Sequence, residues 1–71
     1  MAKYRVWIDK GKYVSDCERV TLKDSPNDYL RLRDFPWEIC REKKKAVYIL
    51  LNAKDKREAK KMAQELLINN L

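Results

Sequence analysis

The residues best suited to chemistry are the bases of one segment, residues 41–61. It holds nine Lys and Arg side chains but only three acids, Glu42, Asp55 and Glu58. The chain of 71 residues has 17 bases and 11 acids, and this segment alone accounts for the net charge of +6. Clustered bases are typical of surfaces that hold phosphate groups, because each cation that neutralises a phosphate releases a condensed counterion.

Eight of these bases are candidate phosphate contacts. They are Lys43, Lys44, Lys45, Lys54, Lys56, Arg57, Lys60 and Lys61. At 100° per residue, the last four fall along one flank of a helix, while Glu58 and Glu65 fall on the other. A cation in the first helical turn costs roughly 0.3–1 kcal/mol against the helix dipole, and a bound polyanion would offset that cost. The alternative interpretation is a lysine-rich solvated face.

Residues for catalysis are scarce. The chain has no histidine, the usual acid–base group at neutral pH, and its single glycine leaves no phosphate-cradling loop. Cys17 and Cys40 lie 23 positions apart and match no zinc pattern, so we predict that they are small buried hydrophobes in a reducing compartment. We therefore expect no enzyme, no metal, no cofactor and no small-molecule substrate.

The bases lie on or beside a strand–helix unit. Residues 46–51 are a continuous apolar run, which predicts a strand buried on both faces. A helix over residues 56–68 follows, with Asp55 as its N-cap and Glu58 completing a capping box. An apolar stripe on this helix should face the sheet, against Val6, Val47 and Ile49. Its members are Ala59, Met62, Ala63, Leu66 and Leu67.

The first third of the chain predicts a hairpin. Residues 4–8 alternate as a strand, residues 9–12 form a turn in which Gly11 supplies a positive φ, and residues 13–22 return as a weaker edge strand. Trp7 shares a strand face with Lys3 and Arg5. We expect this tryptophan to pack beneath a neighbouring element; the alternative is a stacking platform beside cations, as single-strand binders use.

The middle of the chain is ambiguous. Ser25 and Pro26 could begin a short helix, whereas Leu30 and Leu32 alternate with arginines as a strand would, and we favour the strand. Residues 37–41 alternate again, and residues 42–45 join them to the apolar strand through a basic turn. The whole predicts one α+β domain over residues 1–71. It should be a small, mainly antiparallel sheet of about four strands with one C-terminal helix on one face.

Residues 55–60, Asp-Lys-Arg-Glu-Ala-Lys, resemble the helix start of the double-stranded RNA-binding domain, which carries a Lys-Lys-x-Ala-Lys pattern after its third strand. This resemblance spans residues 47–67 and implies that Lys56, Arg57 and Lys60 contact phosphates. The strand–helix ending is also similar to the arm-type DNA-binding domain of tyrosine recombinases. A further resemblance, through the opening strand and residues 65–70, is to the small subunit of formylglycinamide ribonucleotide amidotransferase.

The leading hypothesis is a small, basic, cytoplasmic nucleic-acid-binding module, with DNA and RNA both open. The alternative is a non-catalytic assembly subunit whose partner is acidic. An apolar C-terminus, with Ile68 and Leu71, and an edge strand guarded only by Asp16 and Glu18 favour a homodimer. No apolar stretch is long enough to suggest a membrane span or a signal peptide.

Overall fold

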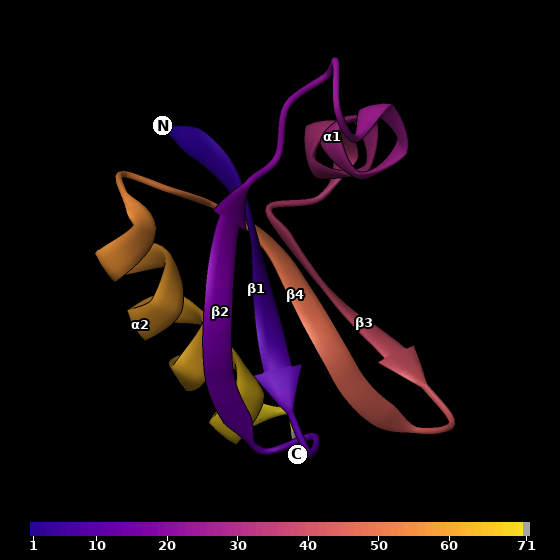
Figure 1. The fold of residues 1–71 in the computed structure, drawn as a ribbon, viewed down its shortest axis with the longest axis vertical. Coiled ribbons are helices and arrows are strands. Elements are labelled where there is room, and N and C mark those ends of the chain that lie inside the picture. The colour runs from indigo at the N-terminus through magenta and orange to yellow at the C-terminus, as the bar shows by residue number, and fades with distance from the viewer. Residues whose placement is uncertain (71) are drawn as a thin grey trace.

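A computed structural model describes residues 1–70 of the chain. Two strands, a helix, two further strands and a second helix follow one another (Figure 1). The elements are β1 (Ala2–Asp9), β2 (Tyr13–Arg19), α1 (Pro26–Asp34), β3 (Trp37–Glu42), β4 (Lys45–Ala53) and α2 (Lys56–Asn69). No helix in this part of the chain is both long enough and apolar enough to cross a membrane.

The strands form one antiparallel sheet in the order β2-β1-β4-β3. β4 lies inside the sheet, and its apolar run is buried on both faces. Ile49 and Leu51 belong to the core beneath α2, whereas Leu50 belongs to the core on the opposite face. The expected α+β class, the four antiparallel strands and the C-terminal helix on one face are confirmed. β2 is an edge strand, as predicted, but it ends at Arg19 rather than at residue 22.

α2 packs over β2, β1 and β4. Ala59, Ala63 and Leu67 are buried, and the two alanines let the helix backbone approach the sheet closely. The predicted stripe is therefore correct in position but differs in detail, because Met62 and Leu66 are only half-buried at its margin. Leu67, 2% exposed, is the largest side chain that α2 buries.

The opposite face of the sheet is partly covered by α1, and here the expected strand is wrong. Pro26 occupies the first turn of this helix. Backbone N–H groups in that turn have no intrahelical acceptor, so the missing N–H of proline costs no hydrogen bond. A strand would place Leu30 and Leu32 on one face, whereas in the helix Leu32 is 5% exposed and Leu30 is 45% exposed. Leu32 packs with Val20 and Leu50, so tertiary burial of one leucine decides between the two patterns.

Both hairpins form as predicted. Lys10 and Gly11 have positive φ values of 54° and 69° in the β1–β2 turn. Lys43 and Lys44, with φ values of 51° and 71°, form the two-residue β3–β4 turn. Positive φ at both central residues is the signature of a type I′ turn, in which side chains other than Asn, Asp and Gly are strained.

Candidate nucleic-acid interface

The structure divides the eight candidate bases into two groups. The hairpin lysines are Lys43, Lys44 and Lys45, at the β3–β4 turn. The helix-start bases are Lys54, Lys56, Arg57, Lys60 and Lys61, beside or within the first two turns of α2. Lys45 is also the first residue of β4, and residues 46–53 of that strand separate the groups, a rise of about 26 Å at 3.3 Å per residue. Figure 1 shows the β3–β4 turn and the start of α2 at opposite ends of the sheet.

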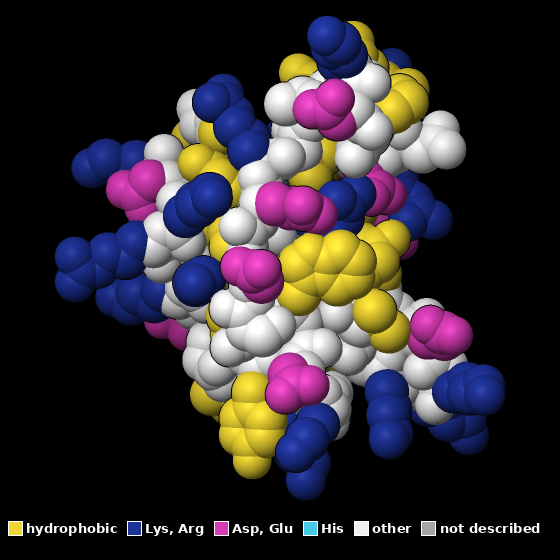
Figure 2. Space-filling model, in the orientation of Figure 1, with side chains coloured by type: hydrophobic (Ala, Val, Ile, Leu, Met, Phe, Trp, Pro, Cys, Tyr) yellow, Lys and Arg dark blue, Asp and Glu magenta, His cyan; other side chains and the backbone are white. Residues whose placement is uncertain are grey.

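All five helix-start bases are exposed. Within residues 1–70, the cations that form ion pairs are Arg5, Arg31 and Arg33, so none of the helix-start bases is paired with an acid. Residues 54–61 hold five bases and two acids, a net charge of +3. This small region therefore presents uncompensated positive charge to solvent (Figure 2, left).

The two acids within this region bind the backbone. Asp55 Oδ1 accepts a hydrogen bond from the Glu58 N–H over 2.8 Å, which caps α2 as predicted. Glu58 Oε1 accepts from the Lys54 N–H over 3.4 Å, one residue earlier than a standard capping box. Both carboxylates stabilise the helix start, and the neighbouring ammonium and guanidinium groups stay available for other anions.

One flank of α2 lies over the edge strand β2. Lys56 and Lys60 are close enough to the buried Cys17 to lower its pKa, although burial is the larger effect and raises the pKa of that thiol overall. Cys17 therefore stays a neutral, buried thiol, as expected from the sequence. These two lysines place the basic flank beside the β2 edge of the sheet.

Arg19 was not among the predicted site residues. It lies on the same face of β2 as Cys17, two residues closer to the end of the sheet where α2 begins. It is exposed and has no acidic partner within residues 1–70. The alternation of Cys17 and Arg19 along the strand was the available signal, but the pairing of β2 with β1 was needed to assign the face.

The hairpin lysines lie beside the β1–β2 turn. A Cβ placed on Gly11 would lie 3.6 Å from Lys45 Cβ, so the two turns are neighbours. Lys10 and Lys12 of the β1–β2 turn are exposed and add positive charge at this end of the sheet, although they lie far from residues 41–61 in sequence. The result is a second basic region, separate from the helix-start bases (Figure 2, bottom and lower right).

The face of the sheet opposite α2 is organised differently. Arg5 forms ion pairs with Glu18, at 2.6 Å, and with Asp28. Burial lowers the pKa of Arg5, but its hydrogen bonds to Asp28 and Glu18 outweigh that effect and raise the pKa overall. This guanidinium is already neutralised by two carboxylates, so it is poorly placed to bind a phosphate.

Trp7 also lies on this face. The expectation that it packs beneath another element is wrong, since its residue is 37% exposed. Its indole N–H donates to Glu18 over 3.3 Å, and its ring contacts Tyr48 edge-to-face with the centroids 5.3 Å apart. Figure 2 shows hydrophobic side chains at the centre of this face, bordered by acidic and basic side chains. A nucleic-acid base stacked on the Trp7 ring would lie beside the carboxylate of Glu18, whose negative charge is unfavourable next to a phosphate backbone.

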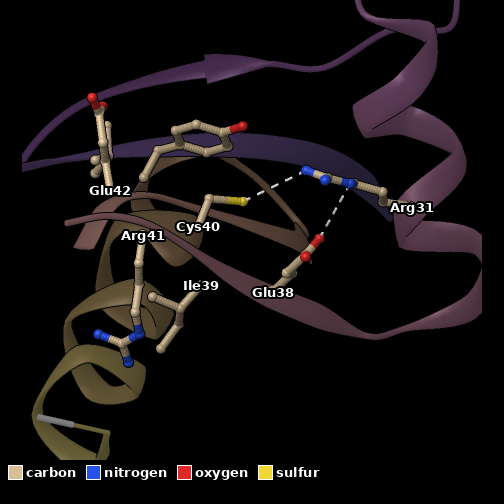
Figure 3. Close-up of a pocket in the computed structure, with 8 residues that line it drawn as sticks. Arg31, Glu38, Ile39, Cys40, Arg41 and Glu42 are labelled. Atoms are coloured by element: carbon tan, nitrogen blue, oxygen red, sulfur yellow. Dashed lines mark hydrogen bonds and ion pairs between the residues drawn. The ribbon is translucent and has the colours of Figure 1, made fainter. Parts of the chain in front are cut away.

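A hollow of about 400 Å³ lies along β3 (Figure 3). On one side of the strand, the Arg31 guanidinium is 3.7 Å from a Glu38 carboxylate oxygen and 3.9 Å from Cys40 Sγ. Cys40 is only half-buried, unlike the fully buried residue predicted from the sequence, because β3 is an edge strand. Partial burial still raises the pKa of its thiol, so this thiol is not an activated nucleophile. No group of three or more His, Cys, Asp or Glu side chains within residues 1–70 is arranged to hold a metal ion.

Comparisons of the chain with protein-family models, with curated proteins and with solved structures found no match. A functional proposal for this chain therefore rests on where its own side chains lie. The helix-start bases are the larger of the two candidate groups, and they are adjacent to the N-terminus of a 14-residue helix.

Proposed function

We propose that this chain is a small nucleic-acid-binding protein that holds backbone phosphates with the helix-start bases. One observation supports this proposal above the others: five exposed cations lie together at the start of α2 without an acidic partner in residues 1–70. On the opposite face of the sheet, by contrast, Arg5 and Arg31 both form ion pairs. Positive charge is thus left uncompensated at α2.

The helix adds to this effect. The first turn of an α-helix presents N–H groups without intrahelical partners and the positive end of the macrodipole, and both favour an anion. Asp55 takes up one of these N–H groups, that of Glu58. A phosphate near Lys56 and Arg57 would relieve repulsion among the cations and between the cations and the dipole. Such contacts are made to the backbone, so they should bind different sequences about equally.

The hairpin lysines lie far enough from the helix-start bases to be tested separately. At a separation of about 26 Å, a duplex that rises 3.4 Å per base pair would need about eight base pairs to extend from one group to the other. A shorter duplex cannot contact both groups at once. Two groups of comparable charge therefore allow the site to be tested against an internal control.

The test compares two sets of substitutions. One variant changes Lys56, Arg57, Lys60 and Lys61 to Gln, and the control changes Lys43, Lys44 and Lys45 to Gln. Binding of labelled DNA and RNA, as duplexes of about six base pairs and as single strands of about three nucleotides, is measured by fluorescence anisotropy over a range of salt concentrations. For the natural sequence, log affinity should fall linearly with log salt, with a slope of about 0.7–0.9 per phosphate contact.

We expect the helix variant to lose most of its affinity and of its salt dependence, equally across sequences, while the hairpin variant binds as the natural protein does. Circular dichroism should show both variants folded, because all seven side chains are exposed. Absence of binding at low salt, or equal binding by the helix variant, would overturn the proposal. The lysines would then be a solvated face, and the alternative hypothesis of an assembly subunit with an acidic partner would take precedence.

A further inference from the structure

The outer edge of β3 is the feature that the proposed function leaves unexplained. β3 pairs with β4 on one side only, so the backbone N–H and C=O groups on its other side have no strand partner. Such an edge is a template for another strand. The hollow of about 400 Å³ is lined by side chains from both faces of β3, which means that it runs along this edge (Figure 3).

The apolar surface beside this edge is incompletely covered. α2 packs mainly over the other three strands of the sheet, and β3 lies at the margin of the helix, where Arg41 reaches the Asn70 carbonyl (Figure 1). Trp37, at the start of β3, is therefore 39% exposed, and Ile39 is only half-buried. Met62 and Leu66, which border the same core, are also half-buried. A strand added to β3 would cover the edge and extend the sheet over this margin.

We infer that a second copy of this chain pairs here, with β3 antiparallel to β3 of the other copy and Ile39 opposite Ile39 at a two-fold axis. A two-fold axis perpendicular to the sheet keeps each side chain on its own face, so paired residues must come from the same face of β3. Ile39 and Arg41 lie on the α2 side, since Ile39 joins the core there and Arg41 donates to the Asn70 carbonyl over 3.1 Å. Glu38 and Cys40 lie on the other side, near Arg31.

The charges along β3 select this register. Pairing about Ile39 places Trp37 of each copy opposite Arg41 of the other, so the dimer contains two such pairs. Each pair can set a guanidinium over an indole ring, which is a favourable contact. It also places Glu38 opposite the uncharged Cys40. Pairing about Glu38, Cys40 or Arg41 instead sets like charges opposite each other. The register about Glu38 pairs Glu38 with Glu38, the register about Cys40 pairs Glu38 with Glu42, and the register about Arg41 pairs Arg41 with Arg41.

The other edge strand is less suited to self-pairing. Pairing β2 about Asp16 sets two aspartates opposite each other, and pairing about Cys17 sets Asp16 opposite Glu18. Both edge strands have a register shift, but the extra residue lies in different strands. Between Val6 and Ile8, three steps of β2 oppose two of β1, so β2 itself bulges at residues 15–16 and its edge is irregular. Between Cys40 and Arg41 the extra residue lies in β4, and β3 remains the regular strand. The homodimer expected from the sequence is therefore assigned to β3 rather than to the second strand. This dimer does not depend on nucleic-acid binding.

The first experiment is sedimentation equilibrium of the full chain, without nucleic acid, from about 10 to 500 µM. A single strand pair buries a small interface, so dissociation in roughly the micromolar range is expected. The apparent mass should rise from 8.6 kDa towards twice that value. Arg41→Glu should weaken the dimer at least tenfold by removing both Trp37 contacts. Arg19→Glu, a matched change on the other edge strand, should leave it unchanged.

A cross-linking experiment tests the register. In a Cys17→Ala background, Glu38→Cys places a new thiol opposite Cys40 of the second copy, whereas Glu42→Cys does not. Oxidation should give a covalent dimer of the first variant and little of the second, although both new thiols lie two residues from Cys40. A monomer of 8.6 kDa at every concentration, equal weakening by the two arginine changes, or equal cross-linking by the two cysteine variants would overturn the inference.

Discussion

The carboxylate of Asp55 caps α2 by accepting the backbone N–H of Glu58 over 2.8 Å. This acid lies among the helix-start bases, between Lys54 and Lys56. It therefore has two opposing effects, because it stabilises the helix that positions the bases and reduces the positive charge that they present. The two effects can be separated experimentally, since asparagine caps helices about as well as aspartate.

Asp55→Asn should keep the cap and remove the negative charge. We expect the free energy of unfolding to stay close to that of the natural protein, while nucleic-acid affinity rises roughly two- to fivefold, equivalent to ~0.3–1 kcal/mol. Asp55→Ala should lower the free energy of unfolding by about 0.5–2 kcal/mol. Urea titration and anisotropy measure the two quantities. Weaker binding by the asparagine variant would show that Asp55 is not a repulsive neighbour of the phosphate.

Leu67 should contribute more to stability than Leu66. Leu67 is 2% exposed beneath α2, whereas Leu66 lies half-buried at the margin of the same core. Leu67→Ala should cost about 2–5 kcal/mol, which is a large fraction of the stability of a domain this small. Leu66→Ala should cost clearly less, because its site already borders solvent. Equilibrium unfolding of both variants checks the order, and a larger loss for Leu66 would contradict the burial of Leu67 beneath α2.

The β3–β4 turn should be improved by residues that tolerate positive φ. Lys43→Asn with Lys44→Gly should raise the free energy of unfolding by roughly 1–2 kcal/mol, since left-handed backbone at a lysine is strained. The same double variant removes two of the three hairpin lysines. A thermal unfolding scan measures the gain, and an unchanged or lower midpoint would argue against the type I′ turn.

The ion pair between Arg5 and Asp28 ties α1 to the sheet. Both side chains are 15% exposed, so Asp28→Asn should lower the free energy of unfolding by roughly 1.5–3 kcal/mol, the range for a hydrogen bond to a charged group. Asp34→Asn is a matched control on the same helix, whose pair with Arg33 has side chains 63% and 73% exposed. That pair should matter little. Equal losses in urea unfolding would mean that Arg5 does not hold the helix.

Local sequence was sufficient for the elements whose signals agree with one another. The apolar run of residues 46–51, the Asp55 cap and the stripe of alanines and leucines all predict a buried strand followed by a helix that covers a sheet. The two hairpins follow from alternating strands around short polar turns. In each case the pattern reports a property of neighbouring residues, namely which side chains share a face and which groups end an element.

Tertiary structure decided the remainder. Residues 26–34 satisfy both a helical and an alternating pattern, and only the burial of Leu32 against Val20 and Leu50 favours the helix. The charges of residues 41–61 are continuous in sequence, yet the extended β4 separates them into two groups about 26 Å apart. For Arg5, whether the base is free or paired is also decided by residues distant in sequence. Arg5 meets Glu18 and Asp28 only because β2 and α1 fold against its strand, while nothing in residues 1–70 brings an acid to pair with the helix-start bases.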